Sequence, residues 1–330
     1  MVPPANLHCF GVFILILAAS RSYTPLNPLY HSMVEYLGLM WWAVGLGLLI
    51  GGLIEYFIPR EYISKMLSKK EGKTIFYAVG LGFLMSACSH GILAIAIQLY
   101  RKGASVPAVV AFLMAAPWAN MTYTLLLFSL FGLKAFYIIF SAILIALTTG
   151  FTYQSLDSRG KVERNTNTLR VREDFSIRRD VKARIEKYKF ERKDAGRALA
   201  GIMHGGWSLA TMIVWWILIG IMAASIIGAY VPPHVFMTYL GPTILGLAVT
   251  LAAATIIEVC SEGSSPIAFE IFRQTGAFGN SFVFLMAGVA TDYTEIGILW
   301  TNVGRRTALW LPVVAGPQII VLGYLFNALL

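Results

Sequence analysis

Two short stretches of the chain have the sequences Cys88-Ser89-His90-Gly91 and Cys260-Ser261-Glu262-Gly263, 172 residues apart. Both lie inside long apolar segments. Further residues match at the same separation: Phe112-Leu113-Met114-Ala115 with 284–287, Arg101 with Arg273, Asn120 with Asp292, and Gly132 with Gly304. Matches at one constant offset indicate an internal duplication. The chain is therefore predicted to consist of two related halves.

Composition places these halves in a lipid bilayer. Of the 330 residues, 57% are hydrophobic and only 13% are charged. A helix that crosses a bilayer needs about 20 mainly apolar residues. Stretches of this kind run over residues 35–57, 74–100, 106–131, 135–153, 207–231, 243–272, 278–300 and 308–329. The predicted fold is an all-α polytopic membrane protein.

The apolar stretch at residues 10–20 is about half as long as a span. The stretch could be the hydrophobic region of a secretory signal peptide or a short first helix. No basic residue precedes the stretch and Arg21 follows it, which favours the helix. The expected division of the chain is an N-terminal segment at 1–31, a first membrane repeat at 32–155, a linker at 156–205 and a second membrane repeat at 206–330.

The linker is the one long polar segment. It holds 14 of the 26 Lys and Arg residues and 8 of the 17 Asp and Glu residues, so it carries +6 of the formal +9 charge. Residues 171–199 within it are expected to form a charged helix. Basic loops beside membrane spans mark the cytoplasmic side and attract anionic lipid. We therefore expect a multi-pass protein of the plasma membrane with a cytoplasmic linker and no nucleic-acid partner.

The basic residues also bear on the relative orientation of the halves. If every apolar segment crosses once, the halves are parallel and the basic loop at 60–73 lies on the side opposite the linker. If the segments 74–100 and 243–272 instead enter and return at their Cys-Ser-x-Gly turns, that loop and Arg305-Arg306 share the linker's side. We favour the second arrangement, which makes the halves inverted repeats with re-entrant helices.

Two further interruptions are expected at residues 117–120 and 288–292, in the segments that follow the Cys-Ser-x-Gly turns. Backbone groups freed by a break are tolerated at membrane depth only where protein or a water-filled cavity satisfies them. The four broken segments are therefore predicted to meet near the midplane, where inverted-repeat transporters bind substrate.

This meeting point would bring Cys88 and His90 of the first half to Cys260 and Glu262 of the second. Two thiols, an imidazole and a carboxylate suit a soft or borderline metal ion or another thiophilic species. The alternative is that each Cys is simply a small buried residue. Recurrence at equivalent positions beside ionisable residues favours the ligand set.

Several carboxylates also lie within the apolar segments. Glu258, Glu262 and Asp292 are deep, and Glu55 is nearer a segment end. An unpaired charge there costs roughly 2.5 to 3.5 kcal/mol on insertion scales, and protonation removes most of that cost. These four residues are candidate proton carriers for coupling. The alternatives are neutral acids hydrogen-bonded within the bundle and, for Glu55, an ion pair with Arg60.

The first half continues with QLYRKGAS (98–105) and VAFLMAAPWAN (110–120), and the second has EVCSEGSSPIA (258–268), FVFLMAGVATD (282–292) and a following Gly-Arg-Arg. With these motifs the chain resembles the ArsP-type predicted permeases, a family associated with efflux of trivalent organoarsenicals and, in relatives, of metal ions. The resemblance covers nearly the whole membrane part and implies candidate site residues at Cys88, Ser89, Cys260, Ser261 and Glu262. Members commonly have Cys-Ser-Cys in the first half. Here the later position is His90, which favours a metal ion or another substrate over a methylarsenical.

The predicted function is a secondary-active permease that exports a thiophilic substrate, an organoarsenical or a soft metal ion, by alternating access with proton coupling. The substrate would lie between the two Cys-Ser-x-Gly turns, lined by Ser89, Ser261, Asn120 and Asp292. No GxGxxG, Walker A or HExxH pattern is present, so nucleotide-driven transport and zinc-protease chemistry have no motif support. For a permease of this kind no cofactor and no enzymatic activity are expected.

Two alternatives from other classes stay open. One is a membrane-embedded thiol- or metal-dependent oxidoreductase that uses Cys88 and Cys260, and the other is a scaffold whose linker recruits a partner. The expected partners of the permease are the small-molecule or ion substrate and the lipid bilayer. Assembly into a homo-oligomer is left open.

Overall fold

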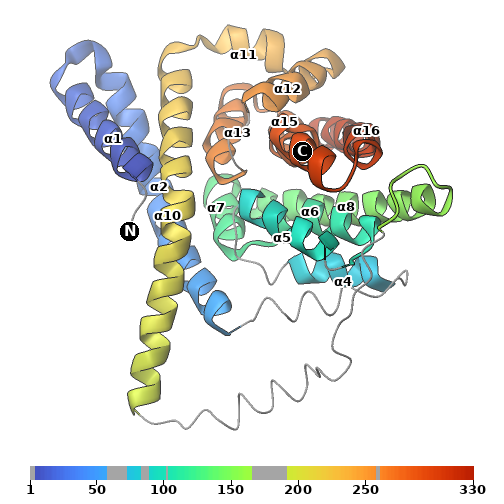
Figure 1. Cartoon of the computed structure of the whole chain (residues 1–330). Helices are drawn as coiled ribbons and strands as arrows, with labels where there is room; N and C mark the ends of the chain where they lie inside the picture. The colour runs from blue at the N-terminus through green and yellow to red at the C-terminus, as the bar shows by residue number, and fades with distance from the viewer. Residues whose placement is uncertain (1–3, 58–72, 83–88, 102, 166–191, 258–260) are drawn as a thin grey trace.

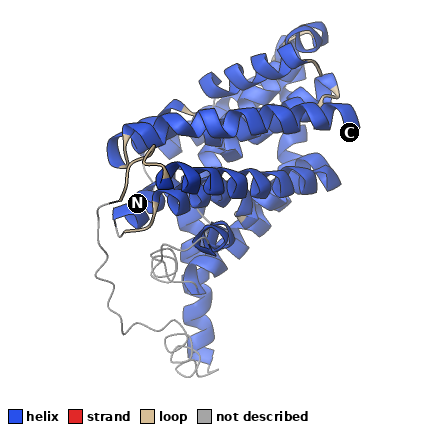
Figure 2. Cartoon of the chain, turned by 90° about the vertical axis from the view of Figure 1, so that its right-hand side faces the viewer, coloured by secondary structure: helices blue, strands red, loops and turns tan. Residues whose placement is uncertain are grey.

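The computed structural model describes residues 4–57, 73–82, 89–101, 103–165, 192–257 and 261–330. Within these ranges the regular structure is entirely helical (Figures 1 and 2). The first half contains α1 (Pro4–Ser22), η1 (Thr24–Leu26), α2 (Asn27–Phe57), α4 (Lys73–Gly82), α5 (Ser89–Arg101), α6 (Val106–Ala119), α7 (Met121–Phe131), η2 (Gly132–Lys134) and α8 (Ala135–Ser158). The second contains α10 (Arg192–Tyr230), α11 (Pro233–Leu240), α12 (Ile244–Ile257), α13 (Ser261–Thr275), α14 (Phe278–Thr291), α15 (Tyr293–Asn302) and α16 (Arg305–Leu329).

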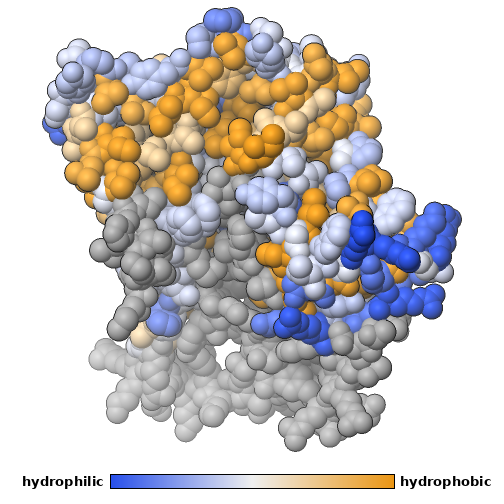
Figure 3. All heavy atoms as spheres, turned by 45° about the horizontal axis from the view of Figure 1, so that its top comes forward, coloured by the Kyte–Doolittle hydropathy of each residue, from blue (hydrophilic) through white to orange (hydrophobic). Residues whose placement is uncertain are grey.

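Among the described residues, 5 helical segments are long and apolar enough to cross a membrane, and the pair α11 and α12, bent by 101°, brings the number to 6 if it counts as one span. Large apolar side chains are exposed on α1, α2, α8 and α16, for example Leu15, Trp41, Phe140 and Val313. In Figure 3 hydrophobic residues gather over the upper part of the face in view, and hydrophilic residues gather at its lower right. The exposed apolar surface is that of a multi-pass membrane protein.

The helix boundaries agree with the interruptions predicted from the sequence. The apolar segment at 106–131 is divided at Asn120, and the segment at 278–300 is divided at Asp292. The predicted breaks at Cys88 and Cys260 lie outside the described residues, and so does most of the predicted charged helix at 171–199. The stretch at 10–20 lies within α1, which has 19 residues and is longer than predicted.

The backbone repeats at the same offset as the sequence. Helices α6 and α14 begin at Val106 and Phe278. Helices α7 and α15 begin one residue after Asn120 and Asp292. Each pair of starting residues is 172 positions apart. The matched glycines at 132 and 304 both have a positive φ, 57° and 152°, which favours glycine over any residue with a Cβ.

The core is centred on α6 and α14. Every described side chain of these two helices is buried, and the two helices contact one another. A helix that is apolar on all sides needs neighbours on all sides. Helix α8 packs against α6, and α16 packs against α14, in the group on the right of Figure 1. The two halves therefore contribute equivalent helices to one continuous core.

Equivalent helices of the two halves run antiparallel to each other. Along α8 and α16, Lys134 donates a hydrogen bond to the carbonyl oxygen of Leu330 at 3.2 Å, and Tyr153 donates to the carbonyl oxygen of Thr307 at 2.7 Å. Helices α2 and α10 pair in the same sense. A Cβ at Gly52 would overlap the backbone of α10 near Gly206, whereas the Tyr230 hydroxyl donates to the carbonyl oxygen of Pro25 at 3.3 Å.

The packing of α2 and α10 differs between the halves. Helix α2 packs against α7, where Gly47 lies directly against the backbone of Thr122. Helix α10, upright in Figure 1, packs against α2 and α13. Its Gly220 touches the backbone of Gly263 so closely that a Cβ at Gly220 would overlap the Gly263 carbonyl oxygen. The two halves thus have equivalent helices in different arrangements.

The close contact of α10 with α13 yields a stability prediction. We expect Gly220→Ala to lower the free energy of unfolding by about 1 to 3 kcal/mol, because its methyl group forces the two helices apart. The matched control is Gly45→Ala in α2, where a Cβ has nothing within 4 Å and alanine is the better helix former. Thermal unfolding in detergent micelles measures both variants. Equal melting temperatures for the two would contradict the prediction.

Candidate functional site

The structure brings together two of the predicted site residues, one from each half. Asn120 separates α6 from α7, and Glu262 lies in the first turn of α13. The side-chain amide of Asn120 donates a hydrogen bond to Oε1 of Glu262 at 3.5 Å. Both residues are 2% exposed. A carboxylate in the core therefore meets the broken helix of the other half.

Asn120 is also the N-terminal capping residue of α7, the helix that follows the break. Its backbone is extended, with φ −66° and ψ 124°, and its side-chain oxygen accepts a hydrogen bond from the amide of Thr122 at 3.0 Å. Asn is a favoured residue at this N-terminal capping position, because it satisfies an amide that has no partner within the helix.

Asp292 has the same role in the second half. Its φ of −57° and ψ of 129° are close to those of Asn120, and it accepts from the amide of Thr294 at 2.9 Å. A second carboxylate oxygen accepts from the Thr294 hydroxyl. Asp292 is 5% exposed. A buried carboxylate thus caps α15 at the position where an amide caps α7.

Three polar groups near Asn120 and Glu262 are buried without a hydrogen-bond partner among the described residues. They are the hydroxyls of Ser261 and Ser264 in the first turn of α13 and the indole N–H of Trp118, two residues before Asn120. Buried polar groups nearly always have a partner, so such a group points to a ligand or a water molecule. Ser261 was predicted from the sequence. Ser264 and Trp118 were not, because neither differs in type from residues that pack in a core.

The two helices that begin at the site, α7 and α13, run side by side away from it. Helices α7 and α13 pack together from Asn120 and Glu262 to Phe131 and Phe272, whose ring centroids are 6.1 Å apart. The amino-terminal ends of both helices therefore meet at the site, and they bring the partial positive charge of the helix dipole with them.

Helices α5 and α15 form the equivalent pair. Arg101 donates to the Asn302 side chain at 3.0 Å, and the Tyr100 hydroxyl donates to the carbonyl oxygen of Val303 at 3.4 Å. Tyr100 and Val303 are the residues that correspond to Phe272 and Phe131 at the offset of 172. The contact of α7 with α13 at one end of the bundle thus has its equivalent in the contact of α5 with α15 at the other end.

The start of the linker is hydrogen-bonded to the region where α5 contacts α15. Glu163 accepts hydrogen bonds from the amides of Arg306 and Thr307 at 2.7 and 2.8 Å, at the start of α16. Asn165 donates to the carbonyl oxygens of Tyr100 and Ala104 at 2.6 and 2.8 Å, at the end of α5. Burial opposes ionisation of Glu163, but the hydrogen bonds outweigh burial and hold the pKa of its carboxyl below the usual value. The linker therefore joins the end of α5 to the start of α16.

Another buried carboxylate, Glu270, was not among the residues predicted from the sequence. Glu270 of α13 is fully buried, and it accepts a hydrogen bond from the hydroxyl of Tyr36 on α2. Arg273 forms ion pairs with Glu270 and with Glu35, each at 3.0 Å. Glu270 lies inside the apolar segment 243–272, three residues before Arg273. That position within an apolar segment is the signal by which it could have been found, and its place in an ion-pair network makes it a link between α2 and α13.

Several predicted site residues have no described surroundings. Cys88, Cys260 and Glu258 lie outside the described residues. Ser89 and His90 belong to α5 and Glu55 belongs to α2, but their side chains are not among those described. Within the described part of the chain no group of three or more His, Cys, Asp and Glu side chains is placed to hold a metal ion. The ligand set of Cys88, His90, Cys260 and Glu262 stays a prediction.

The capping role of Asp292 can be separated from its charge. We expect Asp292→Ala to lower the free energy of unfolding by about 0.5 to 2 kcal/mol, since the amide of Thr294 loses its acceptor. Asp292→Asn keeps the acceptor and removes the charge, so its stability should stay close to that of the wild type. Thermal unfolding in one detergent compares the three proteins. An Asn variant as unstable as the Ala variant would mean that the charge, not the cap, is what matters.

Comparison with known proteins gives three relatives that cover most of this chain. "UPF0718 protein YcgR" of Bacillus subtilis is 23% identical over 88% of this chain and 92% of its own length. "Putative two-component membrane permease complex subunit" of Streptococcus mutans is 20% identical over 98% and 95%. "Putative permease Rv2963" of Mycobacterium tuberculosis is 23% identical over 82% and 70%. No solved structure matches the chain.

The family model ArsP_1, described as a predicted permease, matches residues 26–328. The match includes both Cys-Ser-x-Gly motifs and both capped breaks. It indicates a transporter and so argues against the oxidoreductase alternative. By this match the chain belongs to the ArsP_1 family of predicted permeases.

Proposed function

We propose that this protein is a secondary-active permease that exports a thiophilic substrate, an organoarsenical or a soft metal ion, by alternating access. The observation that carries the proposal is the buried hydrogen bond between Asn120 and Glu262. It joins the helix break at Asn120 in one half to the first turn of α13 in the other half. Such junctions are where transporters built from two repeats bind their substrates.

The polar groups at this junction support the presence of a bound substrate, and the neighbouring cysteines of the sequence suggest its class. The hydroxyls of Ser261 and Ser264 and the indole N–H of Trp118 have unused hydrogen-bonding capacity among the described residues. Cys260 directly precedes Ser261 in the chain, and Cys88 directly precedes the start of α5. In the proposed site, thiolates of Cys88 and Cys260 bind the soft centre, while His90 and Glu262 complete the set. Ser89, Asn120 and Asp292 line the same cavity.

The alternating-access part of the proposal is supported by the helix arrangement. Antiparallel pairing of α8 with α16, and of α2 with α10, is what inverted repeats require. The halves also differ, because α2 packs against α7 whereas α10 packs against α13. In the proposed cycle the halves exchange these two arrangements, and the site opens to the other side of the membrane.

Proton coupling is assigned to the carboxylates of the membrane part. A carboxylate that is protonated on one side and ionised on the other carries a proton during each cycle. Glu262 and Asp292 are buried at the helix starts, and Glu55 and Glu258 are the further candidates from the sequence. In the proposed topology the linker at 156–205 is cytoplasmic, and the repeats at 32–155 and 206–330 each cross three times with one re-entrant segment.

The substrate class is tested by binding. Isothermal titration calorimetry of the purified protein with phenylarsine oxide, and separately with Zn²⁺, should give binding that is lost in the Cys88→Ala/Cys260→Ala double variant. The matched control is Cys9→Ala, which removes the remaining thiol of the chain and should bind as the wild type does. Binding that survives in the double variant would remove the cysteines from the site.

Coupling is tested in proteoliposomes with an imposed pH gradient. Glu262→Gln keeps an acceptor for Asn120 but cannot carry a proton, so uptake of the bound probe should no longer depend on the gradient. Asp292→Asn tests the second carboxylate, and Asp157→Asn at the end of α8 serves as the control. Unchanged gradient dependence in both site variants would contradict the coupling roles.

A further inference from the structure

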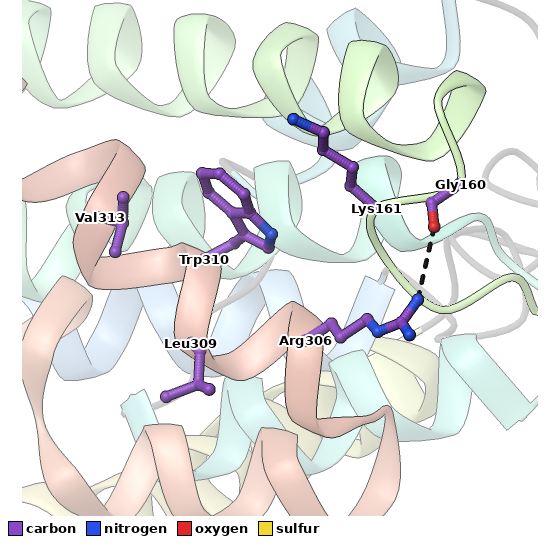
Figure 4. Close-up of a pocket in the computed structure, with 6 residues that line it drawn as sticks. All are labelled: Gly160, Lys161, Arg306, Leu309, Trp310 and Val313. Atoms are coloured by element: carbon purple, nitrogen blue, oxygen red, sulfur yellow. Dashed lines mark hydrogen bonds between the residues drawn. The ribbon is translucent and has the colours of Figure 1, made fainter.

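A cavity of about 500 Å³ lies where the chain leaves α8 and meets the start of α16 (Figure 4). It is lined by Gly160, Lys161, Arg306, Leu309, Trp310 and Val313. The first two residues belong to the turn after α8, and the other four belong to the first three turns of α16. The cavity lies apart from the junction of Asn120 and Glu262.

The lining residues of α16 form one face of that helix. Arg306, Leu309, Trp310 and Val313 are spaced at three, four and seven residues, which places them on the same side. The opposite side, with Thr307, Ala308 and Leu311, is fully buried. Leu309 and Val313 are 47% and 59% exposed, so the lining face of α16 lies on the outer surface of the protein.

Two of the lining residues are cations, and their charged ends point in different directions (Figure 4). Arg306 donates to the carbonyl oxygen of Gly160 at 3.5 Å, and Nζ of Lys161 lies 6.0 Å from the ring centroid of Trp310. Neither cation forms an ion pair with a described residue. Glu163, two residues after Lys161 in the sequence, accepts from the amides and hydroxyl at the start of α16. The cavity therefore has two positive charges available to a ligand.

The rest of the face is apolar. Leu309 and Val313 continue from the cations along α16, and Val321 and Tyr324 extend the exposed surface, 57% and 51% exposed. A distance of about 10 Å along the helix separates the level of Arg306 from that of Val313. A tryptophan stands between the charged and the apolar parts, as is common at the boundary between headgroups and hydrocarbon. The ligand that fits is negatively charged at one end and has a long apolar remainder.

We propose that this cavity binds an anionic phospholipid, whose headgroup is attracted by Lys161 and Arg306 and whose acyl chains follow Leu309, Val313 and Val321. Basic pockets beside membrane helices bind anionic headgroups in this way. The inference rests on the chain being a membrane protein and is independent of the substrate proposed above. Lipid bound here bridges the turn after α8 to α16, next to the contact of Glu163 with Thr307, and so stabilises the junction of the two halves.

The test compares phosphatidylglycerol with phosphatidylcholine, added to the delipidated protein in detergent, by native mass spectrometry and thermal unfolding. Phosphatidylglycerol should remain bound and raise the melting temperature, and phosphatidylcholine should do neither. In the Lys161→Gln/Arg306→Gln variant the affinity for phosphatidylglycerol should fall by about tenfold or more, as expected for the loss of two cations at an anionic headgroup.

The matched control is Arg305→Gln. Arg305 is the neighbouring cation, but its guanidinium lies 4.9 Å from the ring centroid of Trp300, and it does not line the cavity. This variant should bind phosphatidylglycerol as the wild type does. The single variant Lys161→Gln, in an exposed turn, serves if the double variant does not fold.

Two outcomes would overturn the proposal. Equal loss of binding in the Arg305 control would show attraction to the overall positive charge rather than to this cavity. Equal stabilisation by glycerol phosphate or inorganic phosphate would show that the site takes a soluble anion and that the apolar face contributes nothing. A Val313→Gln variant separates these cases further, because it should weaken lipid binding and leave the binding of a soluble phosphate unchanged.

Discussion

A helix that breaks inside a membrane must satisfy the backbone groups that the break frees, and the architecture of this protein follows from how it meets that constraint. Asn120 and Asp292 each accept a hydrogen bond from the amide two residues ahead, so α7 and α15 can begin within the core. The breaks place polar side chains and helix ends where an unbroken helix would present only apolar ones. Without those caps, the ends of α7 and α15 would be left unsatisfied in a low-dielectric interior.

The two capped breaks are equivalent in backbone but not in charge. An amide caps α7, whereas a carboxylate caps α15. The amide of Asn120 can donate to Glu262 because its oxygen alone is used for the cap. A carboxylate has no such donor when it is ionised, so Asp292 cannot contact a second carboxylate in the same way. The difference gives the two halves distinct chemical roles within one repeated scaffold.

Besides the contacts in the core, two groups of contacts join the halves at opposite ends of the bundle. At one end Tyr100 and Arg101 reach Val303 and Asn302, and the start of the linker binds the same region through Glu163 and Asn165. At the other end Phe131 meets Phe272, with the network of Tyr36, Glu270 and Arg273 beside it. In the proposed alternating-access cycle, the protein would loosen one of these ends at a time. The polar contacts at one end and the aromatic and ionic contacts at the other set different costs for doing so.

The sequence alone was sufficient for the features that local composition controls. Apolar length was sufficient to indicate an all-helical membrane protein, although it gave eight segments where the described residues hold 5 or 6 candidate spans. The matching residues determined the offset of 172 at which the helices begin again. The breaks at Asn120 and Asp292 were predictable because polar and small residues interrupt apolar runs there. The family could be recognised for the same reason, since its motifs lie in those interruptions.

Only the tertiary structure decided which of these residues meet. The contact of Asn120 with Glu262 joins positions 142 residues apart, and the ion pair of Arg273 with Glu35 joins positions 238 apart. Glu270 was overlooked because its partner Tyr36 lies on a helix of the other half, and the cavity beside Trp310 exists only where the turn after α8 passes the start of α16. Apolar helices carry little information about which neighbour they face, because many faces of each helix are equally hydrophobic. The packing of the whole bundle, including the choice of α7 for α2 and of α13 for α10, therefore had to be seen in the structure.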